Sequence, residues 1–357
     1  MTQLSMRFDL RVPPFAKTTF ARQHAAMLEM AVWADRIGVE QIVLSEHHGD
    51  PAGFSSAPLT LAAAILGATR RVGVRIAALL VPLHDPVRLA EALATIDCLA
   101  PGRISVVCGA GYRQAEFDMA GVPRTERGAR LEQAVRVMRA AWSGEPFDWQ
   151  GREILATPTP ASPGGPTLLV GGKTRAGARR AARLRCAFAP AVSSLDVIRA
   201  YFEACEEEGF GGASVYGASS FDAYRARQRA GAVNAPGFVM VSHDPDATWE
   251  RIGPYAEFDA RTYAAWQEDG VVSSWAVPDA ASWRELRASG NFVVATPDEC
   301  VALAVRDGQL MLHPLMGGLE PELAFEALHL FESAVLPRLE VGRAAPGPPG
   351  EDGGESA

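Results

Sequence analysis

The sequence predicts an α/β fold, a (β/α)8 TIM barrel with insertions before and after its seventh strand. Eight short apolar, strand-like segments alternate with helix-like segments, which is typical of a parallel sheet whose crossovers are helices. Proline and capping residues begin several of the helical segments. The alternative is a doubly wound open sheet, but an early G-x-G-x-x-G turn is missing.

The first half of the chain contains four of the predicted strands. They are residues 7–12, which end at Pro13-Pro14, and residues 41–44, 74–81 and 104–108. A helix with an apolar face precedes the second strand and ends at Gly38, a typical stop signal. A second helix begins at Pro58 and runs to residue 66. A third is capped by Asp85 with Pro86 in its first turn.

The second half contains the other four predicted strands, residues 167–170, 186–189, 237–241 and 309–312. The predicted helices are residues 125–142, 175–184, 195–208 and 321–336, and Thr296 to Glu299 form a capping box. Residues 211–236 and 244–290 exceed a minimal barrel, and the second insertion carries four tryptophans. Both insertions are interpreted either as walls of a substrate pocket or as surface helices that pack on the barrel or a second subunit.

Composition limits the classes of function. A chain of 357 residues with 48% hydrophobic residues supports one large domain, residues 1–342, followed by a Gly-, Pro- and Glu-rich tail, residues 343–357, that is expected to be disordered. The net charge of -8, without a basic block, argues against nucleic acid as the main partner. Five scattered cysteines favour a reducing, cytoplasmic setting. The apolar runs are too short to cross a membrane.

A charged cluster, Glu46-His47-His48, follows the second predicted strand. The ends of barrel strands carry the chemistry of TIM barrels, so these residues are candidate catalytic groups. Neighbouring residues of an extended chain point to opposite sides, which argues against a shared metal ion. We expect one imidazole to face the lumen as an acid or base and the other, with Glu46, to orient it or fix the loop. A purely structural role for all three is the alternative.

Two glycine-containing turns are candidate cofactor-binding sites. Gly171-Gly172-Lys173-Thr174 joins the fifth strand to a helix, where close backbone approach, helix amides and the lysine charge favour a phosphate. The alternative is a plain turn in which Thr174 caps the helix. Gly109, after the fourth strand, would let a flat ring lie against the backbone or would simply make a turn.

Six stretches, taken together and in order, resemble the bacterial-luciferase-like family of flavin-dependent oxidoreductases. The resemblance extends from Met6 to Leu339. The stretches are residues 44–49, 83–91, 101–104, 109–117 (Gly109-Ala110-Gly111-Tyr112-Arg113 with Glu116-Phe117), 170–174 and 312–318.

The resemblance implies a barrel, usually dimeric, that binds reduced FMN or a reduced deazaflavin at the C-terminal ends of its strands. It points to His47 as the catalytically important histidine. It places the flavin phosphate at residues that match the family's pattern, Gly171, Gly172, Thr174 and Arg175, with Lys173 beside them, and the flavin ring near Ala77 and Ala78. Gly109 and Tyr112, in the turn after the fourth strand, are further candidates to contact the ring. The family's cysteine beside the flavin falls on Gly109, so its role is not transferred to Cys108.

On this resemblance, the first hypothesis is a monooxygenase that uses reduced FMN and O2 to oxygenate a small organic substrate. No dinucleotide fingerprint is present, so a separate flavin reductase is the expected source of the reduced flavin. The first alternative is a deazaflavin-dependent reductase or dehydrogenase on the same fold, and the second is a non-catalytic flavin-binding protein. A metal-dependent barrel hydrolase finds no supporting ligand spacing. Phe54, Tyr112 and Trp275 are compatible with a medium-sized apolar or aromatic substrate, and charges near the mouth do not indicate an acidic one.

Overall fold

The computed structural model describes residues 2–229, 236–267 and 282–340. The strands are β1 (Gln3–Phe8), β2 (Gln41–Leu44), β3 (Gly73–Leu79), β4 (Ile104–Cys108), β5 (Phe147–Trp149), β6 (Arg152–Ile154), β7 (Thr167–Gly172), β8 (Ala187–Pro190), β9 (Phe238–Val241), β10 (Phe292–Ala295) and β11 (Gln309–Leu312). The helices are α1 (Phe20–Ile37), α2 (Pro58–Ala68), α3 (Pro86–Leu99), α4 (Gln114–Ala120), α5 (Arg127–Ala141), α6 (Arg175–Arg183), α7 (Leu195–Glu207), α8 (Phe221–Arg229), α9 (Pro245–Ala265), α10 (Trp283–Ser289), α11 (Pro297–Asp307) and α12 (Pro321–Leu330).

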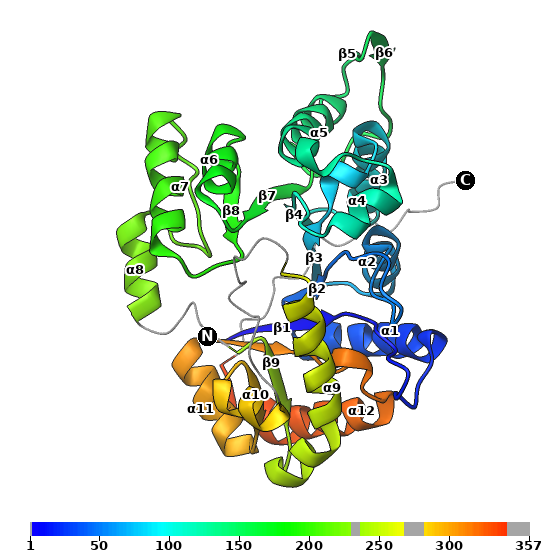
Figure 1. Cartoon of the computed structure of the whole chain (residues 1–357), viewed down its shortest axis with the longest axis vertical. Helices are drawn as coiled ribbons and strands as arrows, with labels where there is room; N and C mark the ends of the chain where they lie inside the picture. The colour runs from blue at the N-terminus through cyan, green and yellow to red at the C-terminus, as the bar shows by residue number, and fades with distance from the viewer. Residues whose placement is uncertain (1, 230–235, 268–281, 341–357) are drawn as a thin grey trace, which may run out of the picture.

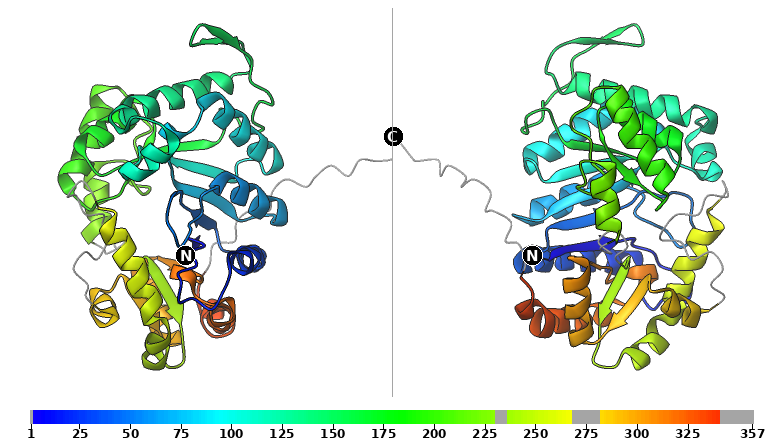
Figure 2. Two further views of the ribbon diagram at one scale, coloured as in Figure 1. Left: turned by 45° about the vertical axis from the view of Figure 1, so that its right-hand side comes forward. Right: turned by 90° about the vertical axis from the view of Figure 1, so that its left-hand side faces the viewer.

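Nine strands form one parallel sheet in the order β10-β9-β11-β1-β2-β3-β4-β7-β8. Eight of them are the strands predicted from the sequence, so the predicted α/β alternation is confirmed. In the described part of the chain, the two ends of this order, β8 and β10, share no backbone pairing. Helices cover the outer face of the sheet, as Figures 1 and 2 show.

The sheet and helices are held together by one large apolar core. Alternate residues of β1 (Leu4, Met6 and Phe8) are fully buried towards it, because strand side chains alternate between the two faces. Helix α1 contributes Met30 and Ala34 to the same core. The alternate residues of β1, which are Gln3, Ser5 and Arg7, point to the opposite face of the sheet.

The first strand differs from the prediction. It covers Gln3–Phe8 rather than residues 7–12, and its register is fixed by pairing with β11 and β2. The chain leaves the sheet before Leu10, which has a left-handed backbone with φ of 59° that no regular strand accommodates. The residues from Asp9 to Arg11 therefore lie at the end of the strand, where the site is built, and not within it.

Outside the two insertions, four elements were missing from the sequence prediction. They are the short helix α4, the strand β10 and the β5–β6 hairpin, whose two strands pair antiparallel and extend from the body in Figure 1. The predicted last helix is confirmed as α12, followed by a π-helical turn at Phe331–Val335.

The two insertions contain helices in their described parts. Helix α8 lies in the first insertion, and α9 and α10 lie in the second, where Trp249 stacks on Trp283 with ring centroids 5.7 Å apart. Trp275 and the predicted tail, residues 343–357, lie outside the described residues. No helix in the described ranges is both long and apolar enough to span a bilayer.

Candidate active site

His47 is held by a carboxylate that the chain supplies from a distant element. The residue follows β2, and its Nδ1 is 2.9 Å from Oε1 of Glu116 on α4. The same oxygen accepts the backbone N–H of His48 at 3.2 Å and Nη1 of Arg113 at 3.1 Å. Arg113 also donates to the His48 carbonyl at 2.8 Å. The imidazole is therefore fixed in orientation by Glu116 and not by Glu46, for which the sequence left open either that role or fixing the loop.

His48 points to a second carboxylate. Its Nε2 lies 3.1 Å from Oε1 of Glu46, and Nε2 of His84 lies 2.8 Å from the same oxygen. The backbone N–H of Leu80 donates to the other Glu46 oxygen. Glu46 thus connects the ends of β2 and β3, and the two adjacent histidines have different partners.

The two histidines have opposite pKa shifts. Burial lowers the pKa of His47 and outweighs the hydrogen bond to Glu116. The hydrogen bond to Glu46 raises the pKa of His48, which is only half-buried. Burial alone would raise the pKa of Glu46, but hydrogen bonds from His48 and His84 lower it to about 2. His47 is therefore a neutral imidazole near pH 7, and Glu46 is ionised.

Four aromatic rings surround His47. The rings of Trp266 and Phe54 lie 4.7 Å and 4.8 Å from its own, and those of Tyr112 and Tyr263 lie 6.0 Å and 6.2 Å away. Tyr263 lies on α9 and Trp266 caps it. The second insertion thus contributes to the site directly, which favours its interpretation as a pocket wall.

A buried cluster of charges lies against these rings. Arg11 is 3.6 Å from Asp9 through Nε and 3.5 Å from Asp259 through Nη1. Burial raises the pKa of Asp259 to about 6, although Arg11 opposes this shift. Nη2 of Arg7 donates to the Tyr263 hydroxyl at 2.7 Å. Burial also lowers the pKa of the nearby His313 to about 3.

The predicted phosphate loop lies at the end of β7. A Cβ atom placed on Gly171 would lie 2.9 Å from Cγ1 of Val107, so the close packing of β7 on β4 requires glycine. Thr174 caps α6 by accepting the N–H of Gly177 at 3.2 Å. Nζ of Lys173 lies 5.3 Å from the Tyr112 ring centroid, which joins this loop to the His47 cluster.

The remaining predicted cofactor residues fall into two groups. Ala77, Ala78 and Gly109 lie together, because a Cβ on Gly109 would be 2.7 Å from that of Ala78, and the Ala77–Ala78 peptide is cis. Arg175 instead pairs with Asp196 at 2.8 Å on the exposed surface.

Some functional candidates were missed by the sequence analysis. They are Glu116, Arg113, Arg11, Tyr263 and Trp266. Glu116 stands in a family-like stretch, but no local spacing connects it to His47.

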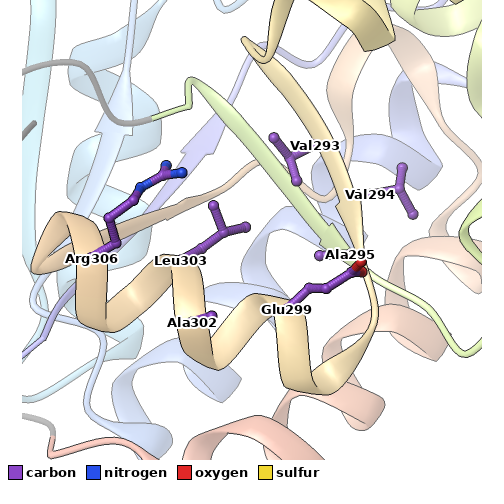
Figure 3. Close-up of a pocket in the computed structure, with 7 residues that line it drawn as sticks. All are labelled: Val293, Val294, Ala295, Glu299, Ala302, Leu303 and Arg306. Atoms are coloured by element: carbon purple, nitrogen blue, oxygen red, sulfur yellow. The ribbon is translucent and has the colours of Figure 1, made fainter.

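A surface pocket lies elsewhere, between β10 and α11. Val293, Leu303 and Arg306 line it together with Val294, Ala295, Glu299 and Ala302, and none of these was a predicted site residue (Figure 3). Within residues 2–229, 236–267 and 282–340, no group of three His, Cys, Asp or Glu side chains is placed to hold a metal ion.

Comparison with known proteins places these features in a family context. The family described as luciferase-like monooxygenase matches residues 6–306. An F420-dependent glucose-6-phosphate dehydrogenase from Rhodococcus erythropolis is 33% identical over 136 residues, 35% of this chain and 40% of that protein. The 4-hydroxyprotoasukamycin monooxygenase of Streptomyces nodosus is 27% identical over 33% of this chain and 32% of that protein. The matches span about two fifths of the length of the first such relatives.

Solved structures show the same fold over nearly the whole chain. A monooxygenase from Streptomyces bottropensis superposes with a TM-score of 0.70 and 22% identity, covering 94% of this chain and 99% of that one. The oxygenating constituent of 3,6-diketocamphane monooxygenase from Pseudomonas putida, in complex with FMN, gives a TM-score of 0.67 and 19% identity, covering 96% of this chain and 100% of that one.

Proposed function

The chain belongs to the luciferase-like monooxygenase family, and we propose that it oxygenates a small organic substrate with reduced FMN and O2. The observation that carries the proposal is a buried imidazole, His47, oriented by Glu116 and enclosed by aromatic rings at the C-terminal ends of the strands. This arrangement supplies a proton acceptor beside aromatic rings that exclude water. We call the cluster of His47, Phe54, Tyr112, Tyr263 and Trp266 the aromatic chamber.

The residues at the ends of β3, β4 and β7 fit a flavin. The helix α6 has its N-terminus behind Gly171, Gly172, Lys173 and Thr174, and this position favours a phosphate. Ala77, Ala78, Gly109 and Tyr112 provide small side chains and one flat ring for the ring system. Arg175 is the weakest member of the set, since its guanidinium already pairs with Asp196.

His47 is the proposed acid–base residue. Because Nδ1 faces the Glu116 carboxylate, Nε2 is the nitrogen available to take a proton on the side of the reactants. Its lowered pKa keeps it unprotonated near pH 7. Glu116 and Arg113 are positioning residues, and Glu46 and His48 fix the loop. Reduced flavin, when bound, supplies the electrons that activate O2.

A deazaflavin-dependent dehydrogenase is the second candidate. It is favoured by the relatives that are F420-dependent glucose-6-phosphate dehydrogenases, which share up to 33% identity over part of this chain. Both candidates use the same barrel end, so the cofactor decides between them.

The deciding experiment is an anaerobic titration of the purified protein with reduced FMN and, separately, with reduced deazaflavin, followed by air. Tight FMN binding and a rate of flavin reoxidation that differs from that of free reduced FMN support the monooxygenase. Tight binding of deazaflavin alone, unchanged by air, supports the dehydrogenase. Binding of neither cofactor contradicts both.

Gly172 provides a test of the phosphate position. Its added Cβ would lie 3.4 Å from Cα of Gly177, an ordinary contact, so Gly172→Ala is a matched control. We expect Gly172→Asp to weaken FMN binding about tenfold or more by charge repulsion, and Gly172→Ala to change it little. Riboflavin, which lacks the phosphate, should respond equally to both variants. Unchanged FMN affinity in Gly172→Asp places the phosphate elsewhere.

Three further properties are part of the proposal. A separate reductase supplies the reduced flavin, which is consistent with the missing dinucleotide fingerprint. The protein acts as a homodimer in the cytoplasm, consistent with the family resemblance and with its scattered cysteines, all free in the structure. Gel filtration with light scattering measures the oligomeric state.

A further inference from the structure

The guanidinium of Arg11 is a set of buried donors without acceptors. Its side chain is fully buried, and none of Nε, Nη1 and Nη2 has a hydrogen-bond partner among the described residues. The Asp9 and Asp259 oxygens lie 3.6 Å and 3.5 Å away, beyond a normal N–H···O hydrogen bond. Buried polar groups in folded proteins almost always have partners. This guanidinium, ion-paired with two carboxylates but hydrogen-bonded to neither, can therefore donate to an acceptor that the described residues do not provide.

The same aromatic rings contact both Arg11 and His47. The Cζ atom of Arg11 lies 4.8 Å from the Phe54 ring centroid and 5.5 Å from that of Trp266. Those two rings are also the nearest to His47. Tyr263 completes the set, at 5.0 Å from Arg11. The unbonded donors and the proposed acid–base residue thus share the aromatic neighbours Phe54, Tyr263 and Trp266.

The charges of the chamber indicate an uncharged ligand. Arg7 and Arg11 are balanced by Asp9 and Asp259, so an anion gains no net attraction and meets two carboxylates. A neutral oxygen acceptor avoids that repulsion and still accepts hydrogen bonds from the guanidinium. The flat rings favour a planar molecule.

We propose that Arg11 is a substrate-binding residue that donates hydrogen bonds to the carbonyl oxygen of a flat, uncharged substrate held beside His47. The inference rests on the proposed function in taking this ligand as the molecule that is oxygenated. The sequence predicts an apolar or aromatic substrate. The inference adds that this substrate carries an oxygen atom that accepts a hydrogen bond.

The test measures binding without flavin, so its outcome is independent of the oxygenation chemistry. The full-length protein is equilibrated by dialysis with acetophenone, with ethylbenzene, which has a similar shape but no carbonyl, and with benzoate, which is anionic. We expect acetophenone to bind about tenfold more tightly than ethylbenzene, as a hydrogen bond to a charged donor provides. A purely apolar chamber would give the reverse order, because ethylbenzene is the more hydrophobic probe.

Variants assign the preference to Arg11. Arg11→Met should remove the preference for acetophenone, and Arg11→Lys should reduce it by losing the guanidinium fork. Arg75→Met is the matched control, since Arg75 is a half-buried arginine of β3 whose Nε donates to Ser105; its probe order should match that of the unmodified protein.

Three results would overturn the inference: equal or tighter binding of ethylbenzene, tighter binding of benzoate than of acetophenone, or an unchanged preference in Arg11→Lys and Arg11→Met. If Arg11→Met does not fold, the probe order of the unmodified protein and of Arg11→Lys decides. If the anaerobic flavin titration fails while acetophenone keeps its Arg11-dependent preference, the proposed function is wrong and the binding site stands.

Discussion

His47 and His48 are neighbours in the chain but occupy contrasting environments. His47 is 7% exposed, and its pKa is lowered although a carboxylate contacts it. His48 is less buried, and its pKa is raised by a carboxylate at a similar distance. The contrast shows that a carboxylate partner alone does not set the charge of a histidine. Burial sets the direction of the pKa shift of His47, and the hydrogen bond to Glu46 sets that of His48.

The contrast divides the cluster by role. The buried pair of His47 and Glu116 faces the aromatic chamber and is suited to proton transfer. The outer group of Glu46, His48 and His84 cross-links the ends of β2 and β3 and is suited to support. Substitutions in the two groups should therefore affect different measurements, turnover for the first and stability for the second.

The largest expected effect is on turnover in His47→Ala. Loss of an acid–base group should slow the reaction by roughly 10²- to 10⁴-fold while folding and flavin binding are retained. His48→Ala is the control and should slow turnover less than tenfold. Steady-state kinetics with reduced FMN in excess measures both. Equal losses of turnover in His47→Ala and His48→Ala would contradict the proposed division of roles.

The second largest expected effect is a loss of unfolding free energy in the variant Glu46→Gln. The folded-state pKa of Glu46, about 2, lies below its usual value of 4.5, so its ionised form stabilises the fold above that usual value, and this stabilisation is lost as the pH falls towards 2. The shift corresponds to roughly 3 kcal/mol at pH 7. Urea unfolding should show a large deficit for Glu46→Gln at pH 7 that shrinks by pH 3. If the loss of unfolding free energy in Glu46→Gln does not depend on pH, Glu46 does not act as an ionised cross-link.

A smaller effect is expected for Glu116→Gln. Glu116 opposes the lowering of the His47 pKa by burial, so the pKa should fall further without this carboxylate. The imidazole should also be held less firmly in its orientation. We expect turnover to fall roughly tenfold, the acid limb of its pH profile to move to lower pH, and Glu116→Asp to restore part of the rate. A lower rate with an unmoved pH profile would indicate a packing role only.

The smallest expected effect is on how the free energy of unfolding changes with pH in variants of His47 and His48. A raised pKa means that His48 stabilises the fold below about pH 6.5 and that this stabilisation is lost as the pH rises through the folded-state value. A lowered pKa means that His47 costs stability as the pH falls below about 6.5. His48→Gln should therefore be more destabilising at pH 5.5 than at pH 8.5, and His47→Gln less so, by under about 1 kcal/mol each. Denaturant titrations at the two pH values measure the slopes, and slopes of the same sign would contradict the assignment.

The sequence predicted what depends on local pattern. The eight strands, the helix caps at Asp85 and Thr296, and the place of Glu46-His47-His48 at a strand end follow from periodicity and capping residues a few positions apart. These signals survive folding because tertiary packing and local preference agree.

The rest depends on contacts between distant segments. Glu116 lies 69 positions from His47, and Arg11 meets α9 some 250 positions later in the sequence, so no local spacing reveals either contact. The strand β10 is an exception, because Phe292–Ala295 is an apolar, partly β-branched run between Gly290 and the helix cap at Thr296 and could have been predicted locally. The start of β1 was missed because pairing with β11, at the other end of the chain, fixes it.

Strand β10 also sets a boundary for protein engineering. It pairs with β9 along four residues, whereas β9 meets β11 at one, Leu312 with Val239. The segment between β9 and β10 contains Tyr263 and Trp266 of the aromatic chamber. Because β10 pairs with β9, this pairing holds the two ends of the segment together. A chimaera that exchanges this segment between relatives to change substrate choice must take Phe292–Ala295 with it, because a junction placed before β10 would graft the pocket wall without its anchor.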